Sequence, residues 1–376
     1  MKKIFIITSA LFACVSMASC QKANPILKDN HLHRDDEFGG AFIDISIPDF
    51  NKLGFKYGDS LSLDFSNGVH YDDIGYYSGY YVAAGQELVV AYPGYDYIKF
   101  CINYGDDVYT KHNFDLDTAV TITVFEKQKY KVIEETLSIS YSDDISTYES
   151  PEEFANFREI KTSNIKPGLL YRGASPIDNR RQRATTVDGL LRSNEIAYDI
   201  DLADSRTTID GFYEQESFAS TYFKSLDDNN KVLPVGMGAA YKSDDFSAKL
   251  KTTLLSILNN EGPYYIHCLE GKDRTGYVCM IIEAMCGASY DDLVDDYFIT
   301  YKNYYGIDKV KDSYKYEMIK SIHIDEMIRY AFDFEKTTNL LTANYRSQVD
   351  NYLEAIGLSN EELYGIRSKL MEASAI

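Results

Sequence analysis

The chain has 376 residues, more than one ordinary domain needs, with 45% hydrophobic and 26% charged side chains. This composition excludes collagen-like, low-complexity and wholly disordered proteins. With 38 basic against 58 acidic residues, the formal charge of −20 disfavours binding to nucleic acid or to an anionic membrane surface.

The first twenty residues have the pattern of an export signal. Lys2 and Lys3 precede an apolar run over residues 4–15, which is shorter than the roughly 20 apolar residues that span a bilayer. Small residues then stand directly before Cys20, an arrangement that resembles a bacterial lipobox, where the chain is cut before the cysteine and its thiol is lipidated. A plain signal peptide with an incidental cysteine is the alternative.

From this pattern we expect residues 1–19 to be a signal peptide and residues 20–40 to be a polar tether that follows the lipidated Cys20. The protein is then an exported bacterial lipoprotein at the outer membrane or cell surface, with the periplasmic face as a second option. The lipid is its only expected contact with a membrane.

The remaining cysteines and a histidine cluster could in principle form disulfides or bind a metal. The cysteines beyond Cys20 are Cys101, Cys268, Cys279 and Cys286. Their spacing shows no pairs, so no disulfide framework is predicted. A polar group in the tether is better explained as solvated sequence than as a metal site: His31, His33, Asp35 and Asp36. We therefore predict no metal and no cofactor.

Short strand patterns fill residues 41–142. They are rich in β-branched or alternating apolar residues and are bounded by polar turns such as Ser66-Asn67-Gly68. The predicted strands are 60–65, 87–92, 119–125 and 132–140. No stretch sustains a helical period. We predict a small all-β domain, either a barrel or a sandwich.

Beyond a polar connector at 142–151, strands alternate with helices, which predicts an α/β domain with a parallel sheet over 152–376. The expected elements are strands over 196–202 and 264–267 and helices over 246–258 and 274–286. Helices dominate the C-terminal part, where capping boxes predict helix starts after Ser289 and Ser359.

Residues 264–276, YYIHCLEGKDRTG, carry the clearest chemical signal. A short apolar strand runs into a tight loop and then into an apolar helix, and ligands bind at such strand-to-helix turns in α/β sheets. Free N–H groups and the helix dipole favour an anion there, and they also stabilise a thiolate at Cys268. Arg274 can grip two oxygens of a bound oxyanion. Together these groups form a site for attack on phosphorus.

Two similar-looking sites do not fit this segment. A Walker phosphate loop needs glycine at position 266 and Ser or Thr at 273, but Ile266 and Asp273 stand there. A Cys–His protease pair is also excluded, because His267 and Cys268 are adjacent on an extended segment and point to opposite faces. We expect His267 to hydrogen-bond the loop from behind.

The segment HCLEGKDRTG resembles the signature of cysteine-dependent phosphatases, in which His-Cys is followed after five residues by Arg and Ser or Thr. It is most similar to an atypical bacterial branch of tyrosine and dual-specificity phosphatases. The resemblance extends to residues 170–176, 201–204 and 295–297. Two positions depart from the family pattern, Gly173 in place of Ser and Ala203 in place of Arg.

The resemblance implies a cysteine-phosphatase-like sheet flanked by helices, and it implies roles for the residues of the loop. Cys268 is the expected nucleophile, Arg274 binds the oxyanion, and Thr275 hydrogen-bonds the thiolate. Lys272 adds positive charge, and the glycines let the backbone close on phosphate. The expected substrate-binding residues are His267, Leu269, Glu270, Gly271, Lys272, Gly276 and Arg172.

Several carboxylates compete for the role of general acid. Asp273 is favoured because related phosphatases with a similar Asp-Arg-Thr ending are proposed to use it. The upstream alternatives are Asp244, Asp245, Asp204 and Asp201.

The expected function is hydrolysis of a phosphomonoester through a phosphocysteine intermediate, with a phosphorylated protein as substrate and protein-tyrosine phosphatase as the preferred activity. A phosphoinositide or inositol phosphate substrate is the first alternative. A surface lipoprotein that binds phosphate without turnover is the second, although pure binding needs no thiol. A sulfurtransferase or arsenate reductase fits the Arg-Thr-Gly ending less well.

Overall fold

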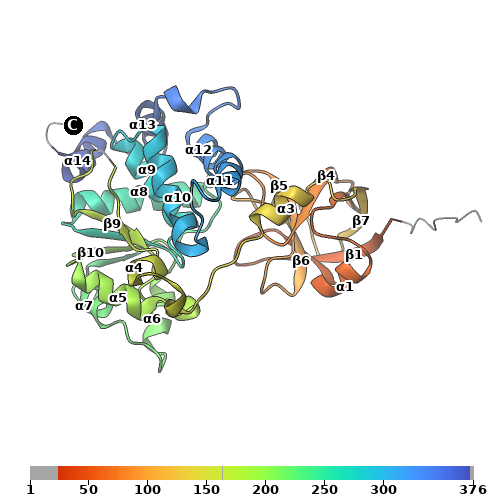
Figure 1. Cartoon of the computed structure of the whole chain (residues 1–376), viewed down its shortest axis with the longest axis horizontal. Coiled ribbons are helices and arrows are strands. Elements are labelled where there is room, and N and C mark those ends of the chain that lie inside the picture. The colour runs from red at the N-terminus through yellow and green to blue at the C-terminus, as the bar shows by residue number, and fades with distance from the viewer. Residues whose placement is uncertain (1–23, 163, 373–376) are drawn as a thin grey trace, which may run out of the picture.

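The computed structural model describes residues 24–162 and 164–372, which form a barrel unit and an α/β unit joined by a connector (Figure 1). The predicted signal peptide and Cys20 lie outside the described residues. Among those described, no helix combines the length and apolar character needed to cross a membrane.

The N-terminal unit is a closed seven-stranded barrel with the strand order β1-β2-β6-β5-β4-β3-β7. Its strands are β1 (Ile26–Arg34), β2 (Ala41–Ser46), β3 (Ser60–Phe65), β4 (His70–Tyr77), β5 (Glu87–Val90), β6 (Tyr97–Ile102) and β7 (Ala119–Glu126). Strands β4 and β5 pair in parallel and the other neighbours are antiparallel. Three short helices decorate it: α1 (Ile47–Lys52), α2 (Val108–Lys111) and α3 (Lys131–Leu137).

The structure corrects the predicted tether, because residues 26–34 form strand β1. This strand pairs with β2 on one side and with β7 on the other, and it thereby closes the barrel. Leu27 and Leu32 are buried in the barrel core. Closure leaves no unpaired strand edge, which explains why a segment of polar appearance is ordered.

The strand predicted over 132–140 is also wrong, because residues 131–137 form helix α3. Its residues are β-branched, but the burial of Ile133 and Leu137, four positions apart, follows a helical period. The carboxylate of Glu134 accepts hydrogen bonds from the backbone N–H (3.1 Å) and the hydroxyl (2.6 Å) of Ser78. Tertiary contacts therefore override the local propensity.

The C-terminal unit contains a five-stranded sheet in the order β11-β10-β12-β9-β8. The strands are β8 (Arg158–Glu159), β9 (Leu170–Gly173), β10 (Tyr198–Asp201), β11 (Val232–Pro234) and β12 (Tyr264–His267). Strands β9, β12, β10 and β11 run parallel, and β8 is antiparallel to β9. Strand β12, which leads into the signature segment, lies in the middle.

Helices cover both faces of this sheet (Figure 1). They are α4 (Pro151–Phe154), α5 (Ala184–Ser193), α6 (Arg206–Tyr213), α7 (Thr221–Asp228), α8 (Asp244–Asn259), α9 (Asp273–Met285), α10 (Tyr290–Tyr305), α11 (Ser313–Ile319), α12 (Asp325–Phe332), α13 (Tyr345–Ala355) and α14 (Asn360–Leu370). Single turns of other helix types lie at Ile145–Thr147, Asn179–Arg181, Lys320–Ile324 and Leu340–Thr342. The predicted capping boxes at Ser289 and Ser359 are confirmed.

Side chains of β12 alternate between two apolar cores. Tyr264 and Ile266 pack with α8 and α9 on one face, whereas Tyr265 packs with α5 on the other. The first of these cores continues into the barrel unit, since Leu137 of α3 belongs to it. The two units are therefore in direct contact, and α3 lies beside α11 (Figure 1).

Candidate active site

Residues 268–272 form a tight loop between the carboxyl end of β12 and the first turn of α9. Cys268 lies at its base and is only 3% exposed, whereas the side chains of Lys272, Asp273 and Arg274 are partly exposed at its mouth. The N-terminal end of α9 supplies the positive end of a helix dipole at this point. Free N–H groups at the start of a helix favour a bound anion, and Cys268 lies at the other end of the short loop that leads to them.

Two glycines let the loop sit close to the neighbouring strand. Gly271 has φ +65°, and a side chain there would meet the carbonyl oxygen of Gly173 at 2.1 Å. At Gly173, the position where the resemblance led us to expect serine, a side chain would come within 2.6 Å of the Tyr265 hydroxyl. Gly173 is therefore matched to its surroundings in this chain, and the loop packs directly on its backbone.

The carbonyl groups of the loop are bonded to side chains and backbone around it. The Leu269 carbonyl accepts the Ser175 N–H (3.1 Å), and the Glu270 carbonyl accepts the Tyr304 hydroxyl (2.6 Å). The Gly271 carbonyl accepts from Arg172 Nη2 (3.0 Å), and Asn156 Nδ2 also reaches it (3.2 Å). These bonds fix the loop conformation, which preorganises it for a ligand.

Arg172 supports the loop instead of binding substrate, which corrects its predicted role. The side chain is 1% exposed, and its guanidinium also pairs with the Asp296 carboxylate. Burial opposes ionisation of Asp296, but Arg158 and Arg172 outweigh burial and hold the pKa of that carboxyl well below its usual range. The result is a buried ion network beneath the loop.

His267 is also placed away from any substrate, since it is fully buried. Its Nε2 lies 3.0 Å from Asp199 Oδ1 on β10, and its Nδ1 lies 4.0 Å from Asp201 Oδ1. Burial alone would lower the pKa of His267, but the two carboxylates outweigh it and raise that pKa to about 10. The predicted bond from His267 to the loop is replaced by this contact with the neighbouring strand.

Arg274 is held by one nitrogen and keeps the rest of its guanidinium for a ligand. Its Nη1 donates to the Met237 carbonyl (3.1 Å), and within residues 24–162 and 164–372 it forms no ion pair with a carboxylate. The Thr275 hydroxyl is buried and has no hydrogen-bond partner in the same part of the chain. The predicted bond from Thr275 to the Cys268 sulfur is thus not formed here, and an unpaired donor remains at the loop.

The competing carboxylates separate clearly in space. Asp245 pairs with Lys249 (2.8 Å) on the surface of α8, and Asp244 shares the same first helical turn. Asp204 is buried with an unpaired oxygen, and burial raises its pKa although the Arg274 guanidinium acts to lower it. Asp273 lies at the loop mouth, with its side chain 38% exposed. Asp273 and Asp204 therefore remain the candidates near Arg274.

Aromatic side chains gather beside the loop mouth. The Lys272 ammonium lies 3.4 Å from the Tyr305 hydroxyl. The Tyr141 ring stacks on Tyr304 with 4.8 Å between centroids, and its hydroxyl donates to the Glu270 carboxylate. We call Tyr141, Tyr304 and Tyr305 the tyrosine wall. Glu270 is tied to this wall and to Arg181 (3.3 Å), which limits its predicted role in substrate binding.

Of the remaining predicted binding residues, Leu269, Gly271 and Lys272 lie on the loop and Gly276 lies in the first turn of α9. Leu269 and Lys272 are partly exposed, whereas Gly271 and Gly276 are buried. A side chain at Gly276 would meet the Tyr297 ring at 2.6 Å, so this glycine serves helix packing. In the described part of the chain, no group of three or more His, Cys, Asp or Glu side chains could hold a metal ion.

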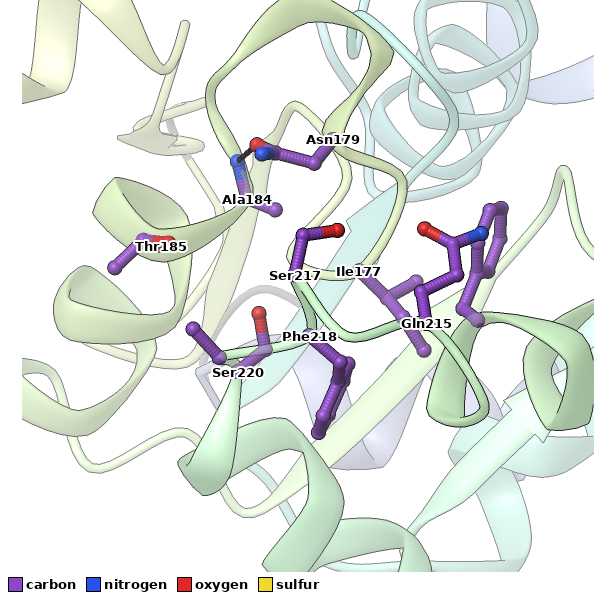
Figure 2. Close-up of a pocket in the computed structure, with 10 residues that line it drawn as sticks. Ile177, Asn179, Ala184, Thr185, Gln215, Ser217, Phe218 and Ser220 are labelled. Carbon is purple, nitrogen blue, oxygen red and sulfur yellow. Dashed lines mark hydrogen bonds between the residues drawn. The ribbon is translucent and has the colours of Figure 1, made fainter.

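A small cavity lies away from this loop. Its volume is about 10 Å³, room for roughly one water molecule, and its lining includes Asn179, Ala184, Gln215, Ser217 and Ser220 (Figure 2). None of the residues lining it belongs to the loop at 268–274. It is too small for a substrate.

Comparison with known proteins identifies the family of this chain. The family model described as "Tyrosine phosphatase family" matches residues 151–372, more than half of the chain. No curated protein matches.

Among solved structures, the core catalytic domain of the PP-IP phosphatase SIW14 from S. cerevisiae, in complex with citrate, is 21% identical with a TM-score of 0.27. The alignment covers 47% of this chain and 90% of that chain. A second structure of the Siw14 catalytic core gives 20% identity and a TM-score of 0.26 over the same shares.

Proposed function

The chain belongs to the tyrosine phosphatase family, and from that premise we propose that it hydrolyses phosphomonoesters through a phosphocysteine intermediate on Cys268. The observation that carries the proposal is the loop between β12 and α9, which brackets an anion site with Cys268 at its base and Arg274 at its mouth. The preferred substrate is a phosphotyrosyl protein.

In the first step, the Cys268 thiolate attacks phosphorus and the bond from phosphorus to the ester oxygen breaks. Arg274 and the backbone N–H groups at the start of α9 bind the three non-bridging oxygens as charge shifts onto them. Asp273 donates its proton to the departing alcohol oxygen. The products are a phosphocysteine, an ionised Asp273 and the free alcohol.

In the second step, water attacks the phosphocysteine and the sulfur–phosphorus bond breaks. Asp273 accepts the proton of that water, and inorganic phosphate leaves together with a restored thiolate. The unpaired Thr275 hydroxyl is a donor available to the sulfur as it departs. This use would satisfy a buried group that otherwise lacks a partner.

Two features support a phosphotyrosyl substrate. Because Cys268 is only 3% exposed, a phosphate must enter deeply to meet it, and the long tyrosyl ring reaches further than a seryl stem. Within the tyrosine wall, Tyr141 and Tyr305 are partly exposed and could contact a substrate ring, whereas Tyr304 is buried beneath Tyr141. Aromatic pairs are worth about 0.5–1.5 kcal/mol beyond their area burial.

A phosphoinositide or inositol phosphate is the alternative substrate, favoured by cations at the mouth. Lys272 is partly exposed, and although burial opposes its charge, Asp273 and nearby tyrosines raise its pKa above the ordinary range. An ammonium that remains charged suits a substrate with more than one phosphate. A panel of phosphotyrosyl peptides, phosphoinositides and inositol phosphates, compared by kcat/KM, decides between them.

The basic activity is tested by hydrolysis of para-nitrophenyl phosphate. We expect Cys268→Ser to abolish turnover and to retain binding of tungstate, an oxyanion, because only the nucleophile is lost. Arg274→Lys should lower kcat/KM by about 10²–10³-fold, since an ammonium cannot make the bidentate contact. The matched control is Cys279→Ala, which removes a buried thiol inside α9 whose pKa burial raises to about 12.

Full activity of Cys268→Ser would overturn the mechanism. Tungstate binding without any turnover by the unaltered protein would instead identify a phosphate-binding protein.

A further inference from the structure

The loop that follows strand β6 of the barrel reaches the candidate active site through Tyr104. The Tyr104 hydroxyl donates a hydrogen bond to Asp273 Oδ1 at 2.6 Å. Its ring stacks on Tyr241 with 4.9 Å between centroids and 15° between planes. The Tyr104 carbonyl accepts a hydrogen bond from Tyr330 (3.0 Å). A side chain of the barrel is thus fastened to the α/β unit beside its catalytic loop.

The barrel holds this loop in an unusual conformation. Tyr104 has φ +52°, in the left-handed region that bulky residues rarely adopt. The preceding Asn103 fixes it, since its side chain donates to the Val82 carbonyl (2.7 Å) and its backbone exchanges bonds with Gln86 (2.9 Å) and Gly85 (2.7 Å). Backbone conformations of this kind persist where the surroundings over-determine them, and they concentrate at functional sites.

The bond to Asp273 has a specific geometric consequence for the carboxyl group. Tyr104 occupies Oδ1 as a donor, so a proton on this carboxyl is carried by Oδ2. The Lys272 ammonium is 4.0 Å from the same Oδ1, on the side already engaged. One oxygen is therefore anchored and the other is left for the substrate.

We propose that Tyr104 is a positioning residue that aims Oδ2 of Asp273 at the leaving-group oxygen, so that the barrel completes the active site of the α/β unit. The inference rests on the proposed function, in which Asp273 is the general acid. It adds that this acid depends on a residue from outside the segment that matches the family, since that segment begins at residue 151.

The experiment compares two substrates on the full-length Tyr104→Phe protein. This variant keeps the ring and its stacking on Tyr241 but loses the donor. We expect kcat on a phosphotyrosyl peptide to fall by about tenfold, the upper end of the net contribution of one hydrogen bond, with little change on para-nitrophenyl phosphate. Para-nitrophenol leaves without much help from an acid. A misaligned acid therefore lowers kcat on the peptide much more than kcat on para-nitrophenyl phosphate.

The ratio of the two rates is measured on one preparation, so it does not depend on how much of the variant is folded. Tyr76→Phe is the matched control, because it also removes a buried hydroxyl, one that bonds Asn51 (2.8 Å) inside the barrel. We expect this control to leave the ratio unchanged. Binding of tungstate by Tyr104→Phe should also persist, since Arg274 and the loop backbone are unchanged.

A double variant separates positioning from general support of the fold. If Tyr104 acts through Asp273, adding Tyr104→Phe to Asp273→Asn should cost no further activity on the peptide. Equal losses on both substrates, or independent losses in the double variant, would overturn the inference while leaving Cys268-dependent turnover standing. Absence of Cys268-dependent turnover in the unaltered protein would overturn the proposed function and this inference together.

Discussion

Cys268 and Cys279 are both buried thiols, yet their positions give them different chemistry. Cys279 lies inside α9, where burial raises its pKa to about 12 and keeps it protonated. Cys268 stands directly after strand β12, at the start of the loop that leads into α9. The nucleophilic role proposed for Cys268 depends on this position and not on its degree of burial.

Single substitutions also decide which carboxylate is the general acid. Replacing Asp273 by Asn should slow hydrolysis of a phosphotyrosyl peptide by about 10²–10⁴-fold and that of para-nitrophenyl phosphate far less, because only the poor leaving group needs a proton. Steady-state kinetics on both substrates measure the difference. Asp245→Asn serves as the control, since its carboxylate pairs with Lys249 at the surface of α8.

Asp204 offers the competing outcome, because it is buried near Arg274 with an unpaired oxygen. If Asp204→Asn shows the dependence on the leaving group and Asp273→Asn slows both substrates equally, the acid is Asp204.

His267 should make stability depend on pH. Its pKa of about 10 in the folded protein exceeds the ordinary 6.5, so the folded state holds a proton that the unfolded chain releases between these values. The stability that His267 contributes is therefore complete below about pH 6.5 and is lost as pH rises toward 10. Burial raises the pKa of Asp201 from 3.8 to about 8. The folded protein therefore also keeps this proton over a range where the unfolded chain has lost it, and stability falls as pH rises from about 4 toward 8.

The measurement is the melting temperature across pH 6.5–10. We expect a steady fall for the unaltered protein and a flatter curve for His267→Asn, which has no proton to lose. Parallel curves for the two proteins would mean that His267 is uncharged in the folded state.

At the scale of helices and strands, sequence patterns succeeded where the controlling contacts are local. The strands at 60–65 and 264–267 and the helix starts after Ser289 and Ser359 depend on alternation, on turns and on capping by neighbours three residues away. Such signals are written in consecutive residues. The order of strand, loop and helix over residues 264–285 belongs to the same group, because these elements follow one another directly in the chain.

Elements fixed by distant contacts could not be predicted in this way. Strand β1 is polar and is ordered by pairing with β7, nearly one hundred positions later in the chain. Helix α3 has β-branched residues and is held by its contact with Ser78. Tyr104 was missed for the same reason, since no local pattern links it to Asp273, 169 positions away. Its left-handed backbone is visible only in the structure.

For the whole molecule, the predicted lipidation site is close in sequence to the barrel. Strand β1 begins at Ile26, six positions after Cys20, and six residues can span at most about 20 Å. We propose that a lipid on Cys20 brings the barrel close to a membrane, with the α/β unit beyond it.

This proposal predicts that Cys20→Ala releases the protein from the membrane fraction or blocks its processing, whereas Cys14→Ala, within the predicted signal peptide, leaves it in place. Fractionation and mass spectrometry of the mature N-terminus measure both effects. An unmodified N-terminal segment on a membrane-free protein would contradict it.

The position of β12 in the sheet also governs the order in which the protein is assembled. Although it is the last strand of the α/β unit in the chain, it lies between β9 and β10. Until residue 267 has been synthesised, the earlier strands can form only two separate pairs, β8 with β9 and β10 with β11, and isolated two-stranded sheets are marginal in water. Since chains emerge from the ribosome N-terminus first, the barrel is complete before this insertion occurs. The nascent sheet therefore closes, and Cys268 takes its place at the end of the central strand, in one event.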